Sequence, residues 1–127
     1  MNIVASIQPY LFGRGAGFSS GYYSDLQKAG MDLAYGSDAP MTSFDPMLAL
    51  ASAMKGGGVL GQDIIRGYTT GSAYGEFAET SKGSISSGML ADLVILSDNL
   101  SSEPTLALNE IKIVLTIVGG KLVYGDL

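Results

Sequence analysis

Two short apolar segments, residues 2–7 and 31–35, lie on either side of a segment with the residue pattern of a helix at 22–29. Apolar runs of this length are typical of buried strands. Ser19 or Ser20 is predicted to cap the helix. The order strand, helix, strand predicts a βαβ unit, which joins parallel strands by a right-handed crossover. The chain is therefore expected to be an α/β protein.

Asp45-Pro46 begins the clearest helix of the chain. An aspartate can accept hydrogen bonds from first-turn amides, and proline suits the first helical position. We expect this helix to end at the glycines 56–58, and we expect further helices at 62–68 and 72–78.

The chain changes character after residue 82, because the later apolar runs have the length of strands. The strand candidates are 91–96, 111–118 and 121–124. Gly119-Gly120 joins the last two and predicts a hairpin with a two-residue turn of the primed type. Asp92 lies at the beginning of the first of these strands and is interpreted as structural.

The composition excludes several kinds of function. Among 127 residues there is no cysteine and no histidine, so disulfides, thiolate ligands and imidazole-dependent triads are excluded. A metal site built from this chain alone would have oxygen ligands only, which suit magnesium, calcium or manganese. The net charge of -5 argues against nucleic acid. No segment approaches the ~20 apolar residues that cross a membrane, and a cytoplasmic protein is expected.

A five-residue string, Gly36-Ser37-Asp38-Ala39-Pro40, directly follows the second apolar segment. Its residue types form good turns in any protein, so these residues alone favour a turn or capping role for Asp38. Asp45 is interpreted as a helix cap because of its position before Pro46.

Five short motifs, taken in their order along the chain, indicate a particular protein family. They are Gln8-Pro9, residues 36–40, Tyr68-Thr69, Gly83-Ser84-Ile85 with Gly88 and residues 91–96, and residues 116–124. Together they make the chain resemble the C-terminal end of the amidohydrolase superfamily, the metal-dependent hydrolases built on a TIM barrel, in its deformylase-like branch. Each motif by itself is weak evidence for the family, whereas five motifs in the order of the family are strong evidence.

The resemblance implies a fold and a division of the chain. Residues 3–7 and 31–35 would be the seventh and eighth barrel strands, and the helix from Asp45 would be the last barrel helix. Residues 1–82 would thus be a partial TIM barrel, its last two βα units. Residues 83–127 would supply strands of a small β-sandwich domain.

The resemblance also implies a role for Asp38, as a metal ligand and as the general base for the attacking water. The reaction would be hydrolysis of a C–N bond in an amide or a cyclic amide. A carboxylate at the C-terminal end of a barrel strand lies where the βα loops converge, which is where barrel enzymes carry out their chemistry. With the resemblance, an inherited ligand position is favoured over capping.

The histidine ligands of the family have no counterpart here, and a complete barrel takes ~250 residues. A divalent metal, zinc-type in the family, would therefore need ligands from a second polypeptide, and the isolated chain is expected to be inactive. The alternative is a non-catalytic fragment that acts as a small oligomeric or interaction protein. Strands without neighbours expose edges and apolar faces, so either a homo-oligomer or a second polypeptide that completes the barrel is expected.

Overall fold

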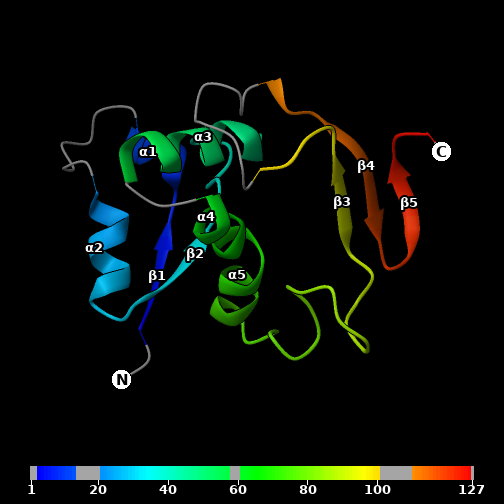
Figure 1. Ribbon diagram of the computed structural model, residues 1–127, viewed down its shortest axis with the longest axis horizontal. Helices are drawn as coiled ribbons and strands as arrows, with labels where there is room; N and C mark the ends of the chain where they lie inside the picture. The colour runs from blue at the N-terminus through cyan, green and yellow to red at the C-terminus, as the bar shows by residue number, and fades with distance from the viewer. Residues whose placement is uncertain (1–2, 14–20, 58–60, 101–109, 127) are drawn as a thin grey trace.

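The computed structural model describes residues 3–13, 21–57, 61–100 and 110–126. A helical part with a two-stranded sheet lies beside a three-stranded sheet (Figure 1). The elements in chain order are β1 (Val4–Ile7), α1 (Pro9–Gly13), α2 (Tyr22–Lys28), β2 (Asp32–Tyr35), α3 (Pro46–Gly57), α4 (Gly61–Tyr68), α5 (Thr70–Gly75), β3 (Leu93–Leu96), β4 (Ile113–Val118) and β5 (Lys121–Tyr124). This mixture of helices and strands confirms the predicted α/β class.

The first two strands pair as the residue order predicts. β1 and β2 are parallel, with Val4 opposite Asp32 and Ile7 opposite Tyr35. Because α2 lies between them in the chain, the predicted βαβ unit is confirmed. Parallel pairing brings the C-terminal ends of both strands to one edge of the sheet.

The two ends of α2 differ from each other in how well the sequence predicts them. Gly21, with φ 97°, holds the N-cap position instead of the predicted serine, and among the described residues no side chain caps the helix. Ser19 and Ser20 themselves lie outside the described residues. At the other end Gly30 has φ 81°, and its N–H donates to the Gln27 carbonyl oxygen at 2.9 Å. Both end positions use a backbone conformation that glycine adopts readily.

Helix α5 ends at Gly75, earlier than the predicted range 72–78. Phe77 takes φ 61°, and the Ala78 N–H reaches back to the Ala73 carbonyl oxygen at 2.8 Å. This closure is the usual C-terminal one, with a phenylalanine where glycine is common. The short helix α1, which begins at Pro9, was not predicted, although proline is favoured at a first helical position.

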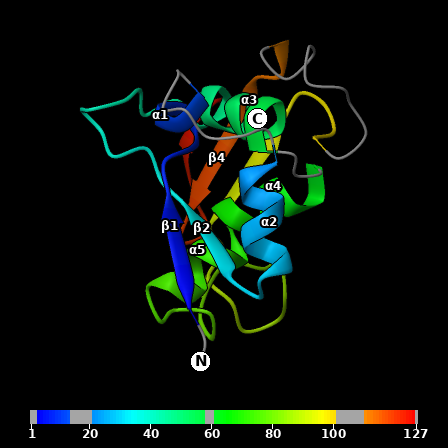
Figure 2. The same cartoon turned by 90° about the vertical axis from the view of Figure 1, so that its left-hand side faces the viewer.

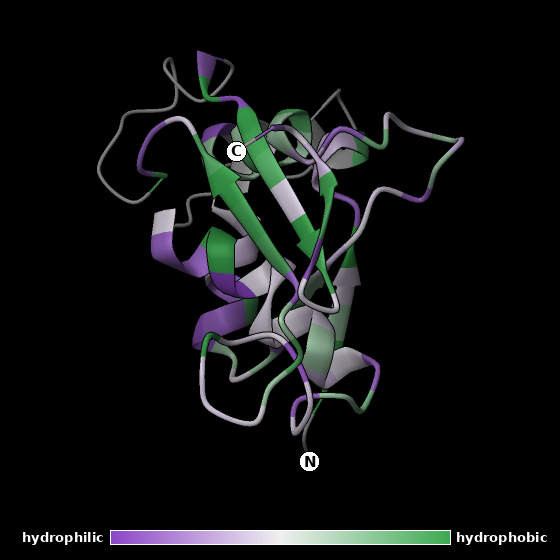
Figure 3. Ribbon diagram, turned by 90° about the vertical axis from the view of Figure 1, so that its right-hand side faces the viewer, coloured by the Kyte–Doolittle hydropathy of each residue, from purple (hydrophilic) through white to green (hydrophobic). Residues whose placement is uncertain are grey.

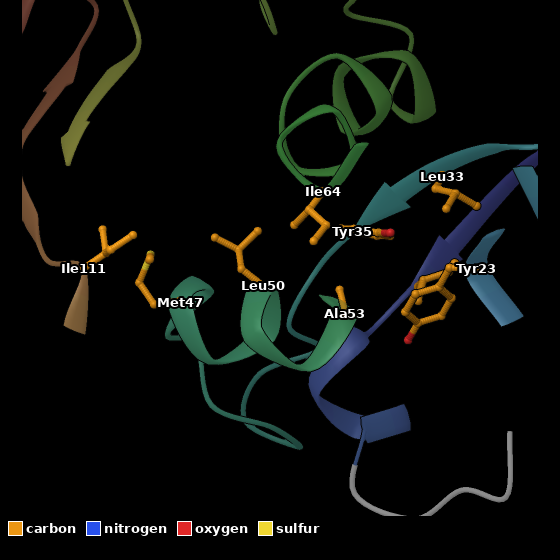
Figure 4. Close-up of a cluster of buried hydrophobic side chains, with 9 residues drawn as sticks. Tyr23, Leu33, Tyr35, Met47, Leu50, Ala53, Ile64 and Ile111 are labelled. Carbon is orange, nitrogen blue, oxygen red and sulfur yellow. The ribbon is translucent and has the colours of Figure 1, made fainter. Parts of the chain in front are cut away.

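The core of the helical part lies between α2, α3, α4 and β2 (Figure 4). Its buried members are Ile7, Tyr23, Leu33, Tyr35, Met47, Leu50, Ala53, Ile64 and Ile111. Leu50 and Ala53 project from α3 toward Ile64 of α4. Glycine at position 71 allows α5 to lie against β2, because a Cβ atom there would overlap the Leu33 carbonyl oxygen.

The second sheet is antiparallel in the order β3-β4-β5. Val118 and Lys121 lie opposite each other across the turn, and Gly119 and Gly120 have φ 56° and 77°. Positive φ at both central residues is the signature of a type I′ turn, so the predicted hairpin with a primed turn is confirmed. The Asp92 Oδ1 accepts a hydrogen bond of 2.7 Å from the Gly119 N–H, so this carboxylate holds the turn against the start of β3.

The three strands are apolar along most of their length (Figure 3), yet many of their side chains are exposed. The exposed apolar members are Val94, Ile95, Val114, Val118, Leu122, Val123 and Tyr124. Leu115 is buried. Within the described ranges, none of the helices has both the length and the apolar character to cross a membrane.

Candidate functional site

Asp38 lies just beyond the C-terminal end of β2, in the segment that projects from the body of the molecule (Figure 2). The Gly36 N–H donates to the Ile7 carbonyl oxygen at 3.0 Å, so the pairing of β1 with β2 extends to the beginning of this segment. Gln8 follows β1 at the same edge. The Asp38 side chain is exposed to solvent.

The backbone around Asp38 is unusual. Asp38 has φ 55°, and the Ala39–Pro40 peptide bond is cis. The Met41 N–H donates to the Asp38 carbonyl oxygen at 2.9 Å. A non-glycine residue with positive φ is uncommon, although aspartate tolerates it better than most. The neighbouring hydrogen bonds must therefore hold this residue in place.

Two side chains close to Asp38 in the sequence bond to the backbone of this segment. The Thr42 hydroxyl donates to the Ser37 carbonyl oxygen. The Ser37 Oγ accepts a hydrogen bond of 3.3 Å from the Ala39 N–H. The segment that carries Asp38 is thus closed on itself by bonds among its own residues.

Asp45 has the capping role that the sequence predicts. Its Oδ1 accepts a 2.9 Å hydrogen bond from the Met47 N–H in the first turn of α3. The Asp45 N–H in turn donates to the Ser43 Oγ at 3.2 Å. Asp45 is thus committed to the helix, whereas no hydrogen bond reaches the Asp38 carboxylate from any residue that the structure describes.

The described residues do not by themselves fit a metal ion. No three of their histidine, cysteine, aspartate or glutamate side chains lie together in a ligand cluster. Two of the other carboxylates have partners of their own: Asp92 accepts from a backbone N–H, and Glu76 pairs with Lys82 at 2.7 Å. A single carboxylate provides one of the several ligands that a divalent ion requires.

Three tyrosines, two of them buried and one half-buried, form a group that no local sequence pattern indicates. The ring centroids of Tyr35 and Tyr68 are 5.7 Å apart, and those of Tyr23 and Tyr35 are 6.0 Å apart. The hydroxyls of Tyr35 and Tyr68 are buried without a hydrogen-bond partner in the described structure. The three residues come from α2, β2 and α4, so only the folded chain brings them together.

Burial governs the ionisation of this group. It raises the pKa of Tyr23 to about 12, with smaller contributions from Tyr22 and Tyr68. Burial and the Asp45 carboxylate raise the pKa of Tyr68 to about 12. Burial also raises the pKa of Tyr35. These phenols stay protonated near neutral pH, so they can donate hydrogen bonds but cannot act as bases there.

A groove of about 660 Å³ separates the helices from the three-stranded sheet. Its lining is mostly apolar, with side chains such as Leu50, Leu93 and Ile117. Its charged lining residues, Glu76, Lys82 and Asp92, all have the partners described above. Every carboxylate that lines the groove in the described structure therefore has a partner. Asp38 does not line the groove.

A model of the amidohydrolase family matches residues 12–124 of this chain. The chain belongs to the amidohydrolase family. The match confirms the resemblance to the amidohydrolase superfamily, and it covers β2 and the whole three-stranded sheet.

Two further similarities agree with this membership of the amidohydrolase family. The chain is 30% identical over 116 residues to "Putative amidohydrolase YtcJ" of Bacillus subtilis (strain 168). This alignment covers 80% of this chain and 22% of that protein. It is also similar to the crystal structure of an amidohydrolase from Thermotoga maritima MSB8, with a TM-score of 0.69 and 24% identity over 82% of this chain and 26% of that one. The second likeness concerns the fold. The chain spans about a quarter of the length of each protein.

Proposed function

We propose that this chain forms the C-terminal part of an amidohydrolase that hydrolyses C–N bonds of amides or cyclic amides, with Asp38 as the general base. The observation that supports this most is the position of Asp38 in a chain of this family. Its carboxylate is exposed at the C-terminal edge of parallel strands, where α/β enzymes place their reactive groups. The other carboxylate of the segment, Asp45, is occupied by capping.

The proposal includes an architecture. Residues 1–82 would be the last two βα units of a TIM barrel, and residues 83–127 would be strands of a β-sandwich domain. The parallel pair β1-β2 and the separate antiparallel sheet support this division. Each sheet has outer strands that pair on one side only within the described residues. A second copy of the chain or a second polypeptide would cover those edges.

The chemistry that this chain can supply is proton transfer. The Asp38 carboxylate would accept a proton from water while the water oxygen attacks the amide carbon. The same proton would then pass to the leaving nitrogen as the C–N bond breaks. A divalent metal, with Asp38 as one ligand, enters the proposal only where residues beyond those described complete the ligand set, and the isolated chain is expected to be inactive.

The test is Asp38→Asn in the assembly that contains this chain and shows amide hydrolysis. The substitution removes the base and keeps the size of the side chain, so we expect kcat to fall about 100-fold or more. Asp45→Asn is the matched control, because asparagine caps a helix as well as aspartate does. It should retain both activity and stability. Full activity in Asp38→Asn would remove Asp38 from the mechanism.

A second function is supported by the exposed apolar side chains. Phe77, Ile85 and Phe44 are 91%, 89% and 84% exposed, and such residues favour association when they gather on one face. The chain would then be a non-catalytic oligomeric or interaction protein. A native mass spectrum separates the two functions. A heteromeric mass that carries metal supports the hydrolase, whereas a metal-free homo-oligomer supports the interaction protein.

A further inference from the structure

We infer that Thr42 is a positioning residue that fixes the direction of the Asp38 carboxylate. Asp38 holds a left-handed backbone conformation, with φ 55°, which few non-glycine residues adopt without support from their surroundings. The segment must therefore contain the contacts that impose it. The catalytic consequence of this inference rests on the proposed function, while its structural content does not.

The argument follows the two peptide planes that meet at the Asp38 Cα atom. The carbonyl carbon of Ser37 is the first atom of the Asp38 φ angle, and its oxygen accepts the hydrogen bond of the Thr42 hydroxyl. The carbonyl oxygen of Asp38 itself accepts from the Met41 N–H at 2.9 Å. Together these bonds fix the planes before and after Asp38. The Cα–Cβ bond of Asp38 then has one direction.

Thr42 is the side chain best placed to do this. It is half-buried, and its second acceptor, the Ser43 carbonyl oxygen, is more distant at 3.4 Å. The remaining side-chain bond near Asp38, from the Ala39 N–H to the Ser37 Oγ, is long at 3.3 Å. This bond restrains the Asp38–Ala39 peptide plane and does not restrain the Ser37–Asp38 peptide plane. The Thr42 hydroxyl is therefore the side-chain group that restrains the Ser37–Asp38 peptide.

The experiment measures the Asp38 backbone directly, in the whole chain labelled for NMR. The wild-type protein should show a strong intraresidue amide-to-Hα nuclear Overhauser effect at Asp38, as positive φ requires. Thr42→Val keeps the side-chain shape but removes the hydroxyl, so it should lose this signal. Thr42→Ser restores the hydroxyl and should retain it. Ser43→Ala, which removes a bond of the same segment to Asp45, is the matched control and should leave it unchanged.

A folded Thr42→Val protein that keeps the positive φ at Asp38 overturns the inference. A second measurement needs no variant: the hydroxyl proton of Thr42 should exchange slowly with solvent, because it is held by the Ser37 carbonyl oxygen. A rapidly exchanging Thr42 hydroxyl proton overturns the inference equally.

In the hydrolytic assembly, Thr42→Val should lower kcat about 10- to 100-fold while KM stays the same, since misplacement of a reacting group weakens the chemical step and not binding. Thr42→Ser should restore kcat. Unchanged kcat in Thr42→Val, with Asp38→Asn inactive, overturns the positioning role. Full activity in Asp38→Asn overturns the proposed function instead, and the NMR result then stands by itself.

Discussion

The helical part and the three-stranded sheet hold their apolar side chains in opposite ways. In the helical part, apolar groups from several elements, such as Tyr35, Leu50 and Ile64, are buried in a shared core. In the sheet, Leu115 is buried whereas neighbours such as Val94 and Val123 are exposed. The helical part therefore derives its stability from packing within the chain. The sheet depends more on local backbone bonds, and its apolar surface is available to a neighbour.

The largest expected difference is that between core and sheet truncations. Ile64 is 2% exposed. Ile64→Ala should lower the unfolding free energy of the protein by about 2–5 kcal/mol, because the substitution leaves a cavity. Val123→Ala, at a position 60% exposed, should change it by about 0.5 kcal/mol or less. Denaturant unfolding followed by circular dichroism measures both. A large loss of unfolding free energy in Val123→Ala would contradict the difference between the two parts, because it would show that this face of the sheet is packed.

Alkaline pH should weaken the helical part through its buried tyrosines. The pKa of Tyr23 is raised from 10.0 to about 12 in the folded protein, so the folded state binds this proton more tightly than the unfolded state. The stabilisation is complete below pH 10 and is lost as the pH rises toward 12, by an amount on the order of 3 kcal/mol. Unfolding free energies measured across this interval should fall less steeply in Tyr23→Phe. Equal slopes in the two proteins would contradict the assignment.

The smallest expected effect concerns the polar clamp of the sheet. Asp92→Ala removes the acceptor of the Gly119 N–H and should cost about 1 kcal/mol. Asp92→Asn keeps an acceptor oxygen and should cost less. Hydrogen exchange at the Gly119 amide reports the change directly, with faster exchange expected in Asp92→Ala. Unaltered exchange there would show that the turn is held by other contacts.

Local residue order was enough to predict much of this fold. The parallel β1-β2 pair, the Asp45 cap and the Gly119-Gly120 hairpin each follow from short-range patterns with a direct physical cause. The N-cap of α2 and the end of α5 did not follow from such patterns. Gly21 holds the N-cap position in place of a serine, and Phe77 has the positive φ that is usual for glycine after a helix.

The candidate site divides in the same way. The position of Asp38 at the end of β2 follows from the order of the segments, so the sequence predicts it. The tyrosine group and the groove beside the sheet join residues from distant elements, and no periodicity marks them. The bond from Thr42 to Ser37 spans five positions of irregular chain, where sequence patterns carry little geometric information. The role of Asp38 in catalysis stays a prediction.

The segment between β2 and α3 is anchored at its two ends, by the Gly36 N–H on Ile7 and by the Asp45 cap. Between these anchors its side-chain bonds stay within the segment. Positions such as Met41 and Phe44, both exposed, can therefore accept new side chains with little effect on the buried core. Substitutions at such positions would alter the surface beside Asp38 while the packing of the helices stays the same.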